Sequence, residues 1–528
     1  MLIILPSAVL FAAALLVVVQ GRVRSRLGTL WIILAGVAYL VWVGVVLLHL
    51  RFPGALEISN WLPGMISQDR LGFEFSPASW FIAINWLALL VCVVFANSAL
   101  LEDRNSVFIL AGSFGISALT LVSLISTSLL SFVITWTMID FMEFVLLVRV
   151  IPEKQTVGKE LISLTFRSAG TFLVIAALAL SSGSGANASI GSANGFVYTL
   201  LILGAGLRMG VLPLHGTFIP EETVRRTMGS LSRLAAPISA FALLTQLPSF
   251  QGGAGQFPAI AIGAGIAAIF GAIMWATSLN DLNGRQYFVL ALAGIGILSA
   301  IDGQPEFVVA VAGILITVGG FLFTYPLKER RLLPAFVVLL LSVFGFPLTP
   351  YIGLWNGNWS VTRLVQLLAM AVVIFGVLRH YSKKENATAD EETWITFFTR
   401  SGLIVLAVSP WLSLVWSKEL ISLKPGWWYS VILSAIVLAG FFYRIYFSSR
   451  LNKADRAMQF IRDIAVVGAK TLRNVLKFDW FFGVFSWFYK QLQQMIQFFE
   501  SILEGEGGVL WSLVFLAILI SVLASAGK

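Results

Sequence analysis

The sequence has little charge. Only 12% of its 528 residues are Asp, Glu, Lys or Arg, about half the roughly 25% typical of soluble domains. By contrast, 58% are hydrophobic, and the mean hydropathy is +0.90. A soluble protein of this length needs a largely polar surface, which excludes a soluble enzyme, a nucleic-acid-binding protein and a disordered chain. A polytopic integral membrane protein remains, with room for about 14–16 spans at roughly 20 residues each.

Cysteine and histidine are also scarce. Cys92 is the single cysteine and lies in an apolar run, which excludes an internal disulfide and any cysteine-based iron–sulfur or zinc site within the chain. The three histidines are His49, His215 and His380, and none stands at metal-ligand spacing from carboxylates. No nucleotide-binding loop is visible. We therefore expect no metal, no cofactor and no catalytic redox site, and we interpret Leu2–Gln20 as a first span and not a cleaved signal peptide.

Long apolar runs define the candidate spans. These runs are continuous and rich in Leu, Ala and Gly, without the two-residue alternation of a membrane barrel, so they predict helices. Sixteen runs begin near residues 2, 29, 79, 106, 127, 160, 196, 229, 257, 285, 306, 332, 361, 394, 427 and 508. The runs near 285, 306 and 361 are the shortest or most interrupted.

The net charge of +9 is distributed asymmetrically between the loops. Most Lys and Arg residues lie in the odd-numbered loops, for example at Arg22, Lys154, Arg225 and Lys383, whereas the even-numbered loop 182–195 has no charge. Because Lys and Arg gather in cytoplasmic loops, this pattern predicts that the odd loops are cytoplasmic and the N-terminus is outside. The excess of positive charge is thus explained by membrane topology and does not indicate a nucleic-acid partner.

The segment 451–507 breaks the pattern of spans. It mixes charges with Phe and Trp at near-helical spacing, which predicts an amphipathic helix along the cytoplasmic face. The helix is either a simple interfacial anchor or a brace against neighbouring subunits. We therefore divide the chain into a transmembrane core, 1–450, this lateral helix, 451–507, and a final span, 508–528.

Two acids lie inside the fifth span. Asp140 and Glu143 are three residues apart, on one face of the expected helix. Carboxylates in hydrocarbon must be paired or protonated, and ionisable groups at membrane depth are functional candidates by default. The pair is therefore either a proton or cation site, or a structural ion pair with an arginine of a neighbouring helix.

The seventh and eighth spans carry the basic counterparts. Arg208 lies within the seventh span, and Pro213 follows, where it removes a backbone donor and interrupts the helix. His215 comes after the break and either shuttles protons or serves as a hydrogen-bonded structural residue. Arg233 lies in the eighth span.

The twelfth span is broken as well. Gly345, Pro347 and Pro350 must interrupt it, and it contains no ionisable side chain between Leu332 and Arg363. Two broken spans five apart indicate two related five-helix units, and because five is odd, the units would have inverted topology. Such repeats are typical of transporters.

Several stretches, in order along nearly the whole chain, resemble the antiporter-like membrane subunits of respiratory complex I, Mrp antiporters and membrane-bound hydrogenases. The strongest stretch, Arg208–Glu222, resembles the segment that follows the family's seventh-helix lysine. The other stretches are LGFEFSPASWFIAIN, MGSLSRLAAPISAF, SLNDLNGRQYFVLALAGIGIL, GFPLTPYIGLW, KFDWFFGVFSWFY and GEGGVLWSLVFLAIL.

The resemblance implies an all-α polytopic fold with about 14 core helices in two inverted five-helix repeats, a C-terminal amphipathic lateral helix and a final transmembrane helix. It also implies translocation of protons or sodium within a larger complex. The key family residues are a fifth-helix glutamate and lysines in helices seven, eight and twelve. Here Thr137, Arg208 and Ser239 stand at or near the first three positions, and Gly357 or Asn358 at the fourth.

Three functional hypotheses follow. In the first, the chain is an antiporter-like subunit of a multisubunit prokaryotic complex, embedded in the lipid bilayer of the inner membrane beside further subunits of its kind. Asp140 and Glu143 then carry the ion-linked charge, Arg208 tunes it, and His215 connects the broken helix to a cytoplasmic half-channel. Arg233 is a further candidate for ion translocation. In the second, the chain keeps the fold and braces its partners without moving ions. In the third, it is the membrane partner in an inorganic-carbon-accumulating complex.

Overall fold

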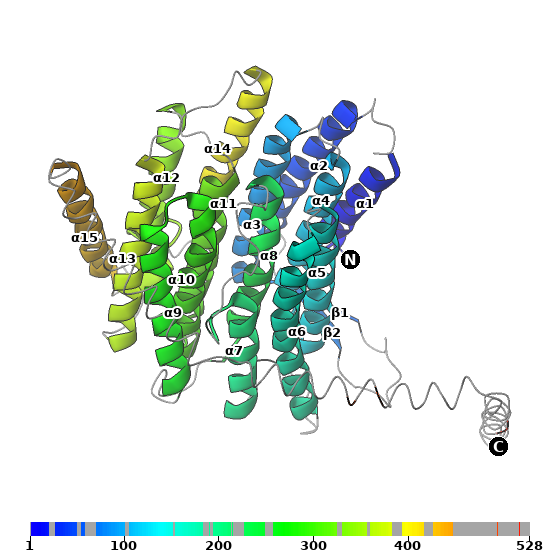
Figure 1. Ribbon diagram of the computed structural model, residues 1–528, viewed down its shortest axis with the longest axis horizontal. Coiled ribbons are helices and arrows are strands. Elements are labelled where there is room, and N and C mark those ends of the chain that lie inside the picture. Colours follow the sequence, from blue (N-terminus) through cyan, green and yellow to red (C-terminus); the bar gives the residue numbers. More distant parts are fainter. Residues whose placement is uncertain are drawn as a thin grey trace. The chain divides into compact units, whose positions relative to one another are not determined.

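The chain is almost entirely helical in the computed structural model (Figure 1). It divides into two compact units, Met1–Met458 and Gln459–Lys528, and every element named below belongs to the first. The structure describes residues 2–20, 27–49, 54–58, 70–100, 105–150, 154–182, 190, 194–212, 214, 226–248, 257–324, 330–355, 360–382, 393–416, 426–446, 491, 494 and 517.

Fifteen α-helices occupy these described ranges. They are α1 (Leu5–Gln20), α2 (Leu27–Leu48), α3 (Pro77–Ala96), α4 (Ser106–Leu124), α5 (Leu129–Val150), α6 (Lys154–Ser182), α7 (Gly195–Met209), α8 (Arg226–Leu244), α9 (Pro258–Thr277), α10 (Asp281–Ile301), α11 (Pro305–Thr324), α12 (Leu333–Val343), α13 (Val361–Ser382), α14 (Thr393–Trp416) and α15 (Trp427–Tyr446). Each of the first fifteen expected runs forms a helix, including those near 285, 306 and 361. The span expected from 508 and the lateral helix expected over 451–507 lie almost wholly outside the described residues.

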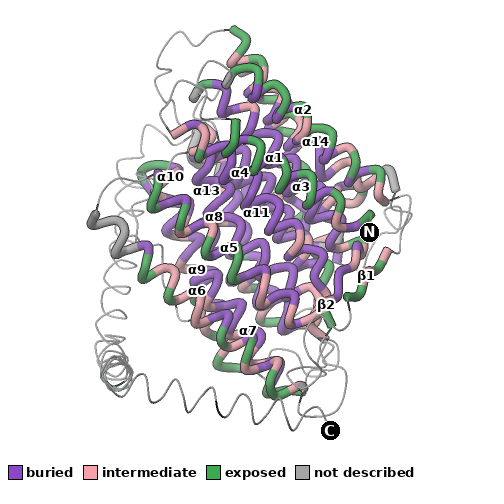
Figure 2. The backbone as a smooth tube through the Cα atoms, turned by 90° about the vertical axis from the view of Figure 1, so that its right-hand side faces the viewer, coloured by how far each residue is buried: buried purple, intermediate pink, exposed green. Residues whose placement is uncertain are grey.

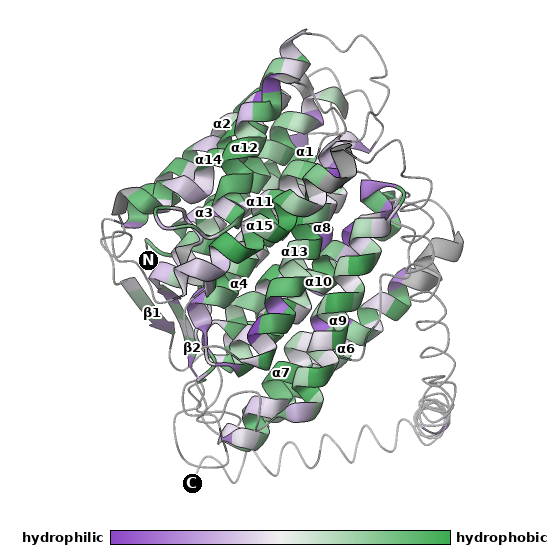
Figure 3. Ribbon diagram, turned by 90° about the vertical axis from the view of Figure 1, so that its left-hand side faces the viewer, coloured by the Kyte–Doolittle hydropathy of each residue, from purple (hydrophilic) through white to green (hydrophobic). Residues whose placement is uncertain are grey.

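The helices have the length and surface of membrane spans. Within the described residues, 11 helices are long and apolar enough to cross a bilayer, and α1, α7, α12 and α15 are shorter apolar helices. Buried residues follow the interior of the helix bundle, and exposed residues follow its outer helix faces (Figure 2). Hydrophobic residues are widespread on those outer faces (Figure 3). Phe141, Phe172 and Leu40 are among the exposed large hydrophobic residues. Apolar groups on both sides of a helix are expected where the solvent is lipid.

Two sets of five helices repeat one pattern of neighbours. In α4–α8, each helix contacts the next one in sequence and α4 contacts α8. In α9–α13, α9 contacts α10, α10 contacts α11, α11 contacts α12, and α9 contacts α13. The second set differs in its fourth helix, since α12 packs mainly on α14, whereas α7 packs on α8. The fourth helix of each set, α7 or α12, is short, and each ends beside a glycine with positive φ, Gly210 at 81° and Gly345 at 68°. A left-handed residue ends a helix most readily when it is glycine. The two five-helix units predicted from the sequence are therefore present.

The end of α7 differs in detail from the sequence prediction. The helix ends at Met209, four residues before Pro213, because Gly210 takes the left-handed conformation and donates its N–H to the carbonyls of Gly206 and Leu207. Glycine has no Cβ to oppose this turn. Pro213 itself lies outside the described residues. In the second unit, α12 ends at Val343, ahead of Gly345, Pro347 and Pro350.

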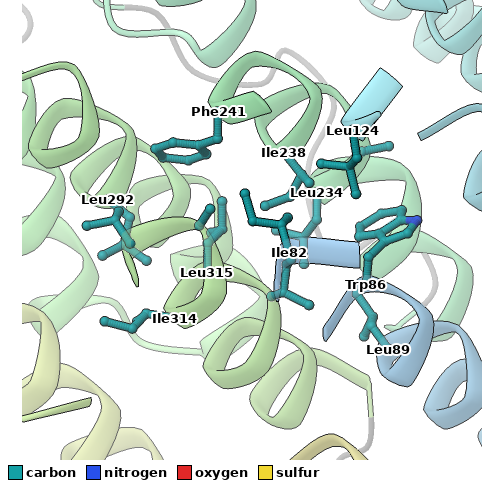
Figure 4. Packing of buried hydrophobic residues seen from close by; sticks show 14 of the residues in the cluster. Ile82, Trp86, Leu89, Leu124, Leu234, Ile238, Phe241, Leu292, Ile314 and Leu315 are labelled. Atoms are coloured by element: carbon teal, nitrogen blue, oxygen red, sulfur yellow. The ribbon is translucent and has the colours of Figure 1, made fainter. Parts of the chain in front are cut away.

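An apolar core joins the helices at the centre of the bundle. Trp86 and Ile82 of α3, Phe241 of α8, Leu292 of α10 and Ile314 of α11 belong to it, and Figure 4 shows their side chains directed into one packed region. Between α9 and α10 the packing brings backbone against backbone, since a Cβ added at Gly294 would lie 2.7 Å from the carbonyl oxygen of Ala264. Small residues at helix crossings allow such close approach in membranes.

A short antiparallel hairpin, which the sequence analysis did not predict, precedes α3. Strand β1 (Gly54–Ile58) pairs with β2 (Leu71–Phe75), and β2 also forms an isolated bridge from Phe73 to Ser126 at the end of α4. Ser76 then caps α3 by accepting a hydrogen bond from the N–H of Ser79, with Pro77 as the first helical residue. The hairpin thereby connects the start of α3, a largely buried helix, to the end of α4 and the start of α5.

Candidate functional site

The two acids of α5 face the interior of the first five-helix unit. Asp140 and Glu143 are almost fully buried, at 3% and 1% exposure, whereas Met138 and Phe141 on the opposite face of the helix are exposed. Positions three or four apart share one face of a helix, so Trp136 joins the acids on the buried side. The carboxylates therefore point into protein, where each requires a charged or hydrogen-bonding partner.

Helix α6 supplies partners that the sequence analysis missed. Arg167 is buried, and its guanidinium donates to Glu143 Oε2 and, at 3.0 Å, to Glu160 Oε1. Its Nε lies 3.9 Å from Asp140 Oδ1. Glu160 and Arg167 are seven residues apart, which is two helical turns, so they lie on the same face of α6. The seven-residue spacing could have identified the two residues as a pair. Glu160, however, falls at the edge of the expected span, beside Lys154 and Lys159, which were assigned to the preceding loop.

Arg208 connects α7 to both neighbouring helices. Its Nη1 lies 2.7 Å from Asp140 Oδ2, and its Nε donates to Ser239 Oγ of α8 at 3.0 Å. The guanidinium also stacks over the ring of Trp136, with 4.6 Å from Cζ to the ring centroid. A planar guanidinium can make these three contacts at once, whereas a lysine ammonium has neither the fork nor the flat face.

Arg233 of α8 completes a network of three arginines and three carboxylates. Its Nη1 lies 3.3 Å from Glu143 Oε1 and 3.7 Å from Glu160 Oε2. The six residues that we call the charged network are Asp140, Glu143, Glu160, Arg167, Arg208 and Arg233, contributed by α5, α6, α7 and α8. Equal numbers of opposite charges lower the cost of burying the group, and loss of one member leaves an uncompensated charge.

A cavity of about 80 Å³ adjoins the charged network. Glu143, Arg167, Arg208 and Arg233 line it, together with Arg285 and other residues of α6, α7, α8 and α10. A single water needs roughly 10–15 Å³ of such space, so the cavity is large enough for several waters or a small ion. A buried charged network beside a polar cavity is the arrangement from which a proton or ion can be exchanged.

The corresponding region of the second unit is different. Beside α12 lies a small cavity of about 10 Å³ whose lining residues are all apolar, among them Phe336, Leu339 and Val343. One buried charge of this unit lies at the start of α13, where Arg363 contacts Gln366 Oε1 at 3.3 Å and the face of Phe307 at 5.0 Å. Among the buried side chains of the described ranges there are five arginines and no lysine.

A further ion pair ties α8 to α10. Arg226 donates to both carboxylate oxygens of Asp281, at 2.8 and 3.1 Å. Asp281 is buried and is the first residue of α10, where the helix dipole stabilises a negative charge. This bidentate pair joins the two five-helix units next to the cavity that Arg285 lines.

The structure brings together four of the five residues predicted for ion translocation: Asp140, Glu143, Arg208 and Arg233. His215 lies outside the described residues. Ser239, which stands near the family's eighth-helix lysine, contacts Arg208 directly.

The long apolar helices define a multi-pass membrane protein, and solved structures share its fold. A chain of the Mrp complex from Dietzia sp. DQ12-45-1b aligns with a TM-score of 0.64 and 12% identity over 100% of this chain. The alignment spans only 63% of the length of that Mrp chain. A chain of the membrane-bound sulfane sulfur reductase, an archaeal respiratory membrane complex, aligns with a TM-score of 0.61 and 14% identity over 98% of this chain and 99% of its own.

Respiratory complex I from Thermus thermophilus contains a third similar chain, with a TM-score of 0.58 and 16% identity over 80% of this chain and 100% of its own. No protein-family model and no curated protein sequence matches this chain. At these identities the likeness establishes the fold: this chain has the fold of the membrane subunits of Mrp-like and complex I-like assemblies.

Proposed function

We propose that this chain is an antiporter-like subunit of a multisubunit prokaryotic membrane complex, and that it translocates protons or sodium. The observation that supports this most strongly is the charged network beside a cavity able to hold water, since both are costly to maintain at membrane depth. The solved structures with the same fold belong to multisubunit membrane complexes, which supports other membrane subunits as partners, including further antiporter-like ones.

In this proposal the carboxylates carry the exchangeable charge. Arginine has a pKa above about 12 and stays protonated in proteins, so Arg167, Arg208 and Arg233 act as fixed charges. A proton that enters from the cavity binds a carboxylate, and Glu143 is the acid that lines the cavity. Arg208 holds Asp140 in place and sets the energy of its ionised form. His215 would extend the path toward the cytoplasmic side.

The basic loops support the orientation proposed with this function. Lys154 and Lys159 belong to the start of α6, and Arg225 and Arg226 stand where α8 begins. Because Lys and Arg gather on the cytoplasmic side, they support an orientation in which this end of the helices, and the cavity with it, faces the cytoplasm and the N-terminus lies outside. The same assignment puts the segment 451–507 on the cytoplasmic face and the chain in the prokaryotic plasma membrane.

Ion flux through the complex reconstituted in vesicles tests the proposal. Asp140→Asn and Glu143→Gln should each abolish flux while the subunits still co-purify, because each change removes a titratable site and keeps a hydrogen-bonding side chain of the same shape. Glu57→Gln is the control, since Glu57 is exposed on the hairpin and pairs with exposed Arg70. Unchanged flux in both buried variants would exclude this function.

A structural subunit is the second candidate, and the apolar surroundings of α12 favour it. If the second unit has no polar path, ions that enter the first unit have no exit through α12. The chain would then hold its partners together, with the segment 451–528 as a brace. This function predicts silent Asp140→Asn and Glu143→Gln variants, and loss of complex assembly when 451–528 is deleted.

A further inference from the structure

The cavity beside the charged network has a strongly basic wall. Four guanidinium groups line it, those of Arg167, Arg208, Arg233 and Arg285, whereas Glu143 is the one carboxylate among the lining residues. All four arginines are buried, with exposures from 0 to 8%. They come from four different helices, α6, α7, α8 and α10, so the basic character does not arise from a single helix surface.

Within the cavity, the acids of the charged network do not neutralise the positive charge of the lining arginines. Asp140 and Glu160 pair with Arg208 and Arg167 from positions that do not line the cavity. Glu143 does line it, but both of its oxygens are engaged: Oε1 accepts from Arg233 at 3.3 Å, and Oε2 accepts from Arg167. The side chains that line the cavity therefore carry more positive than negative charge.

Polar groups without charge supplement the arginines. Ser163, Ser232 and Gln286 also line the cavity and can donate hydrogen bonds. At about 80 Å³, the space exceeds that of one water several times over and suits a halide or an oxyanion of a few atoms. Guanidinium groups match oxyanions in geometry and are less strongly hydrated than ammonium groups, so they form good anion sites in buried positions.

We propose that this cavity is a binding site for one small inorganic anion of the size of chloride or nitrate. The anion lies among Arg167, Arg233 and Arg285 and offsets part of the positive charge of the wall. The proposal does not depend on ion translocation, because a purely structural subunit would also be stabilised by an anion at this position. It assigns a role to Arg285, which belongs to the cavity wall and not to the charged network.

Anion-dependent thermal unfolding of the purified full-length protein tests the site. The unfolding midpoint is measured against sodium chloride and sodium nitrate, with sodium gluconate keeping the ionic strength constant, since gluconate is too large for the cavity. A ligand that binds only the folded state raises the midpoint in a saturable way. Arg285→Gln should raise the half-saturating chloride concentration at least about tenfold, since it removes a charge-assisted contact.

Arg363→Gln is the matched control, because Arg363 is an equally buried arginine that does not line this cavity. It should leave the half-saturating concentration unchanged. Ser163→Leu provides a second variant that fills the cavity and keeps every charge, and it should abolish the chloride response. A midpoint that does not respond to chloride or nitrate, or an equal response in the wild type, Arg285→Gln and Ser163→Leu, would overturn the proposal.

Discussion

Arg208 of α7 and Asp140 of α5 form a direct ion pair, with 2.7 Å between Nη1 and Oδ2, although 68 residues separate them in the chain. The pair is buried on both sides. It connects the short broken helix of the first unit to the helix that carries two of the three acids. Since an arginine cannot release its proton at physiological pH, the pair is a fixed electrostatic contact whose only titratable partner is the acid.

Replacement of Arg208 tests how much of this contact depends on the guanidinium. Arg208→Gln should destabilise the protein by about 3–5 kcal/mol, the cost typical of removing one partner of a buried ion pair. Arg208→Lys should cost less, because it keeps the charge but loses the bond to Ser239 and the stacking over Trp136. Denaturation of the purified protein in detergent measures both. Equal stability of Arg208→Gln and wild type would show that the pair contributes nothing.

The three arginines of the charged network should differ in importance. Arg167 approaches all three carboxylates within 4 Å, whereas Arg233 approaches two and Arg208 one. Arg167→Gln should therefore give the lowest yield of folded protein in the membrane, because it leaves the most uncompensated negative charge. Size-exclusion chromatography of the three Gln variants measures the monodisperse fraction. The reverse order, with Arg208→Gln the worst, would contradict this assignment.

Close packing of α9 against α10 makes Gly294 intolerant of a side chain. A Cβ at this position would lie 2.7 Å from both the carbonyl oxygen of Ala264 and the backbone nitrogen of Ala268. Gly294→Ala should therefore force the helices apart and destabilise the protein by about 1–3 kcal/mol. Gly36→Ala is the control, since nothing lies within 4 Å of its added Cβ, and alanine should stabilise that helix slightly. A neutral Gly294→Ala variant would show that the helices separate without cost.

Leu348, in the interruption after α12, has a positive φ of 67°. A leucine in this left-handed conformation costs roughly 1–2 kcal/mol, and its side chain is 63% exposed, so little packing is lost when it is removed. Leu348→Gly should therefore raise the unfolding midpoint. Leu341→Gly is the matched change, because Leu341 is also exposed but lies inside α12, where glycine should lower the midpoint. A lower unfolding midpoint in both variants would argue against backbone strain at Leu348.

The helices were predictable from the sequence because their signal is compositional. Spans of about 20 apolar residues separated by charged loops are distinctive, and even the weak runs near 285, 306 and 361 form α10, α11 and α13. The hairpin was not predictable by the same reasoning. Leu71–Phe75 is only five residues long, and its pairing with Gly54–Ile58 depends on contacts with α4 and α5.

The charged network was predictable in part. Asp140, Glu143 and Arg208 were identified because charge inside an apolar run is conspicuous. Glu160 was missed because it lies at the very start of the expected span, next to residues 154–159, which were assigned to a loop although they belong to α6. Arg167 lies inside the expected span, and its partners on α5 are not visible from the local sequence. Which arginine meets which acid depends on how α5, α6, α7 and α8 pack, and this information is not local to any of them.

The charged network also constrains how the protein is made. As separate segments, α5, α6, α7 and α8 would each bring at least one charged side chain into the bilayer, and by insertion scales each such residue costs about 2.5–3.5 kcal/mol at mid-membrane. The network neutralises these charges only after the four helices have met. During biosynthesis α5, α6 and α7 must therefore stay near the translocation machinery or in water-accessible positions until α8, which carries Arg233, has been synthesised. Insertion of this unit is thus a collective event of four helices, and a ribosome that stalls before α8 would leave a charged intermediate open to proteolysis.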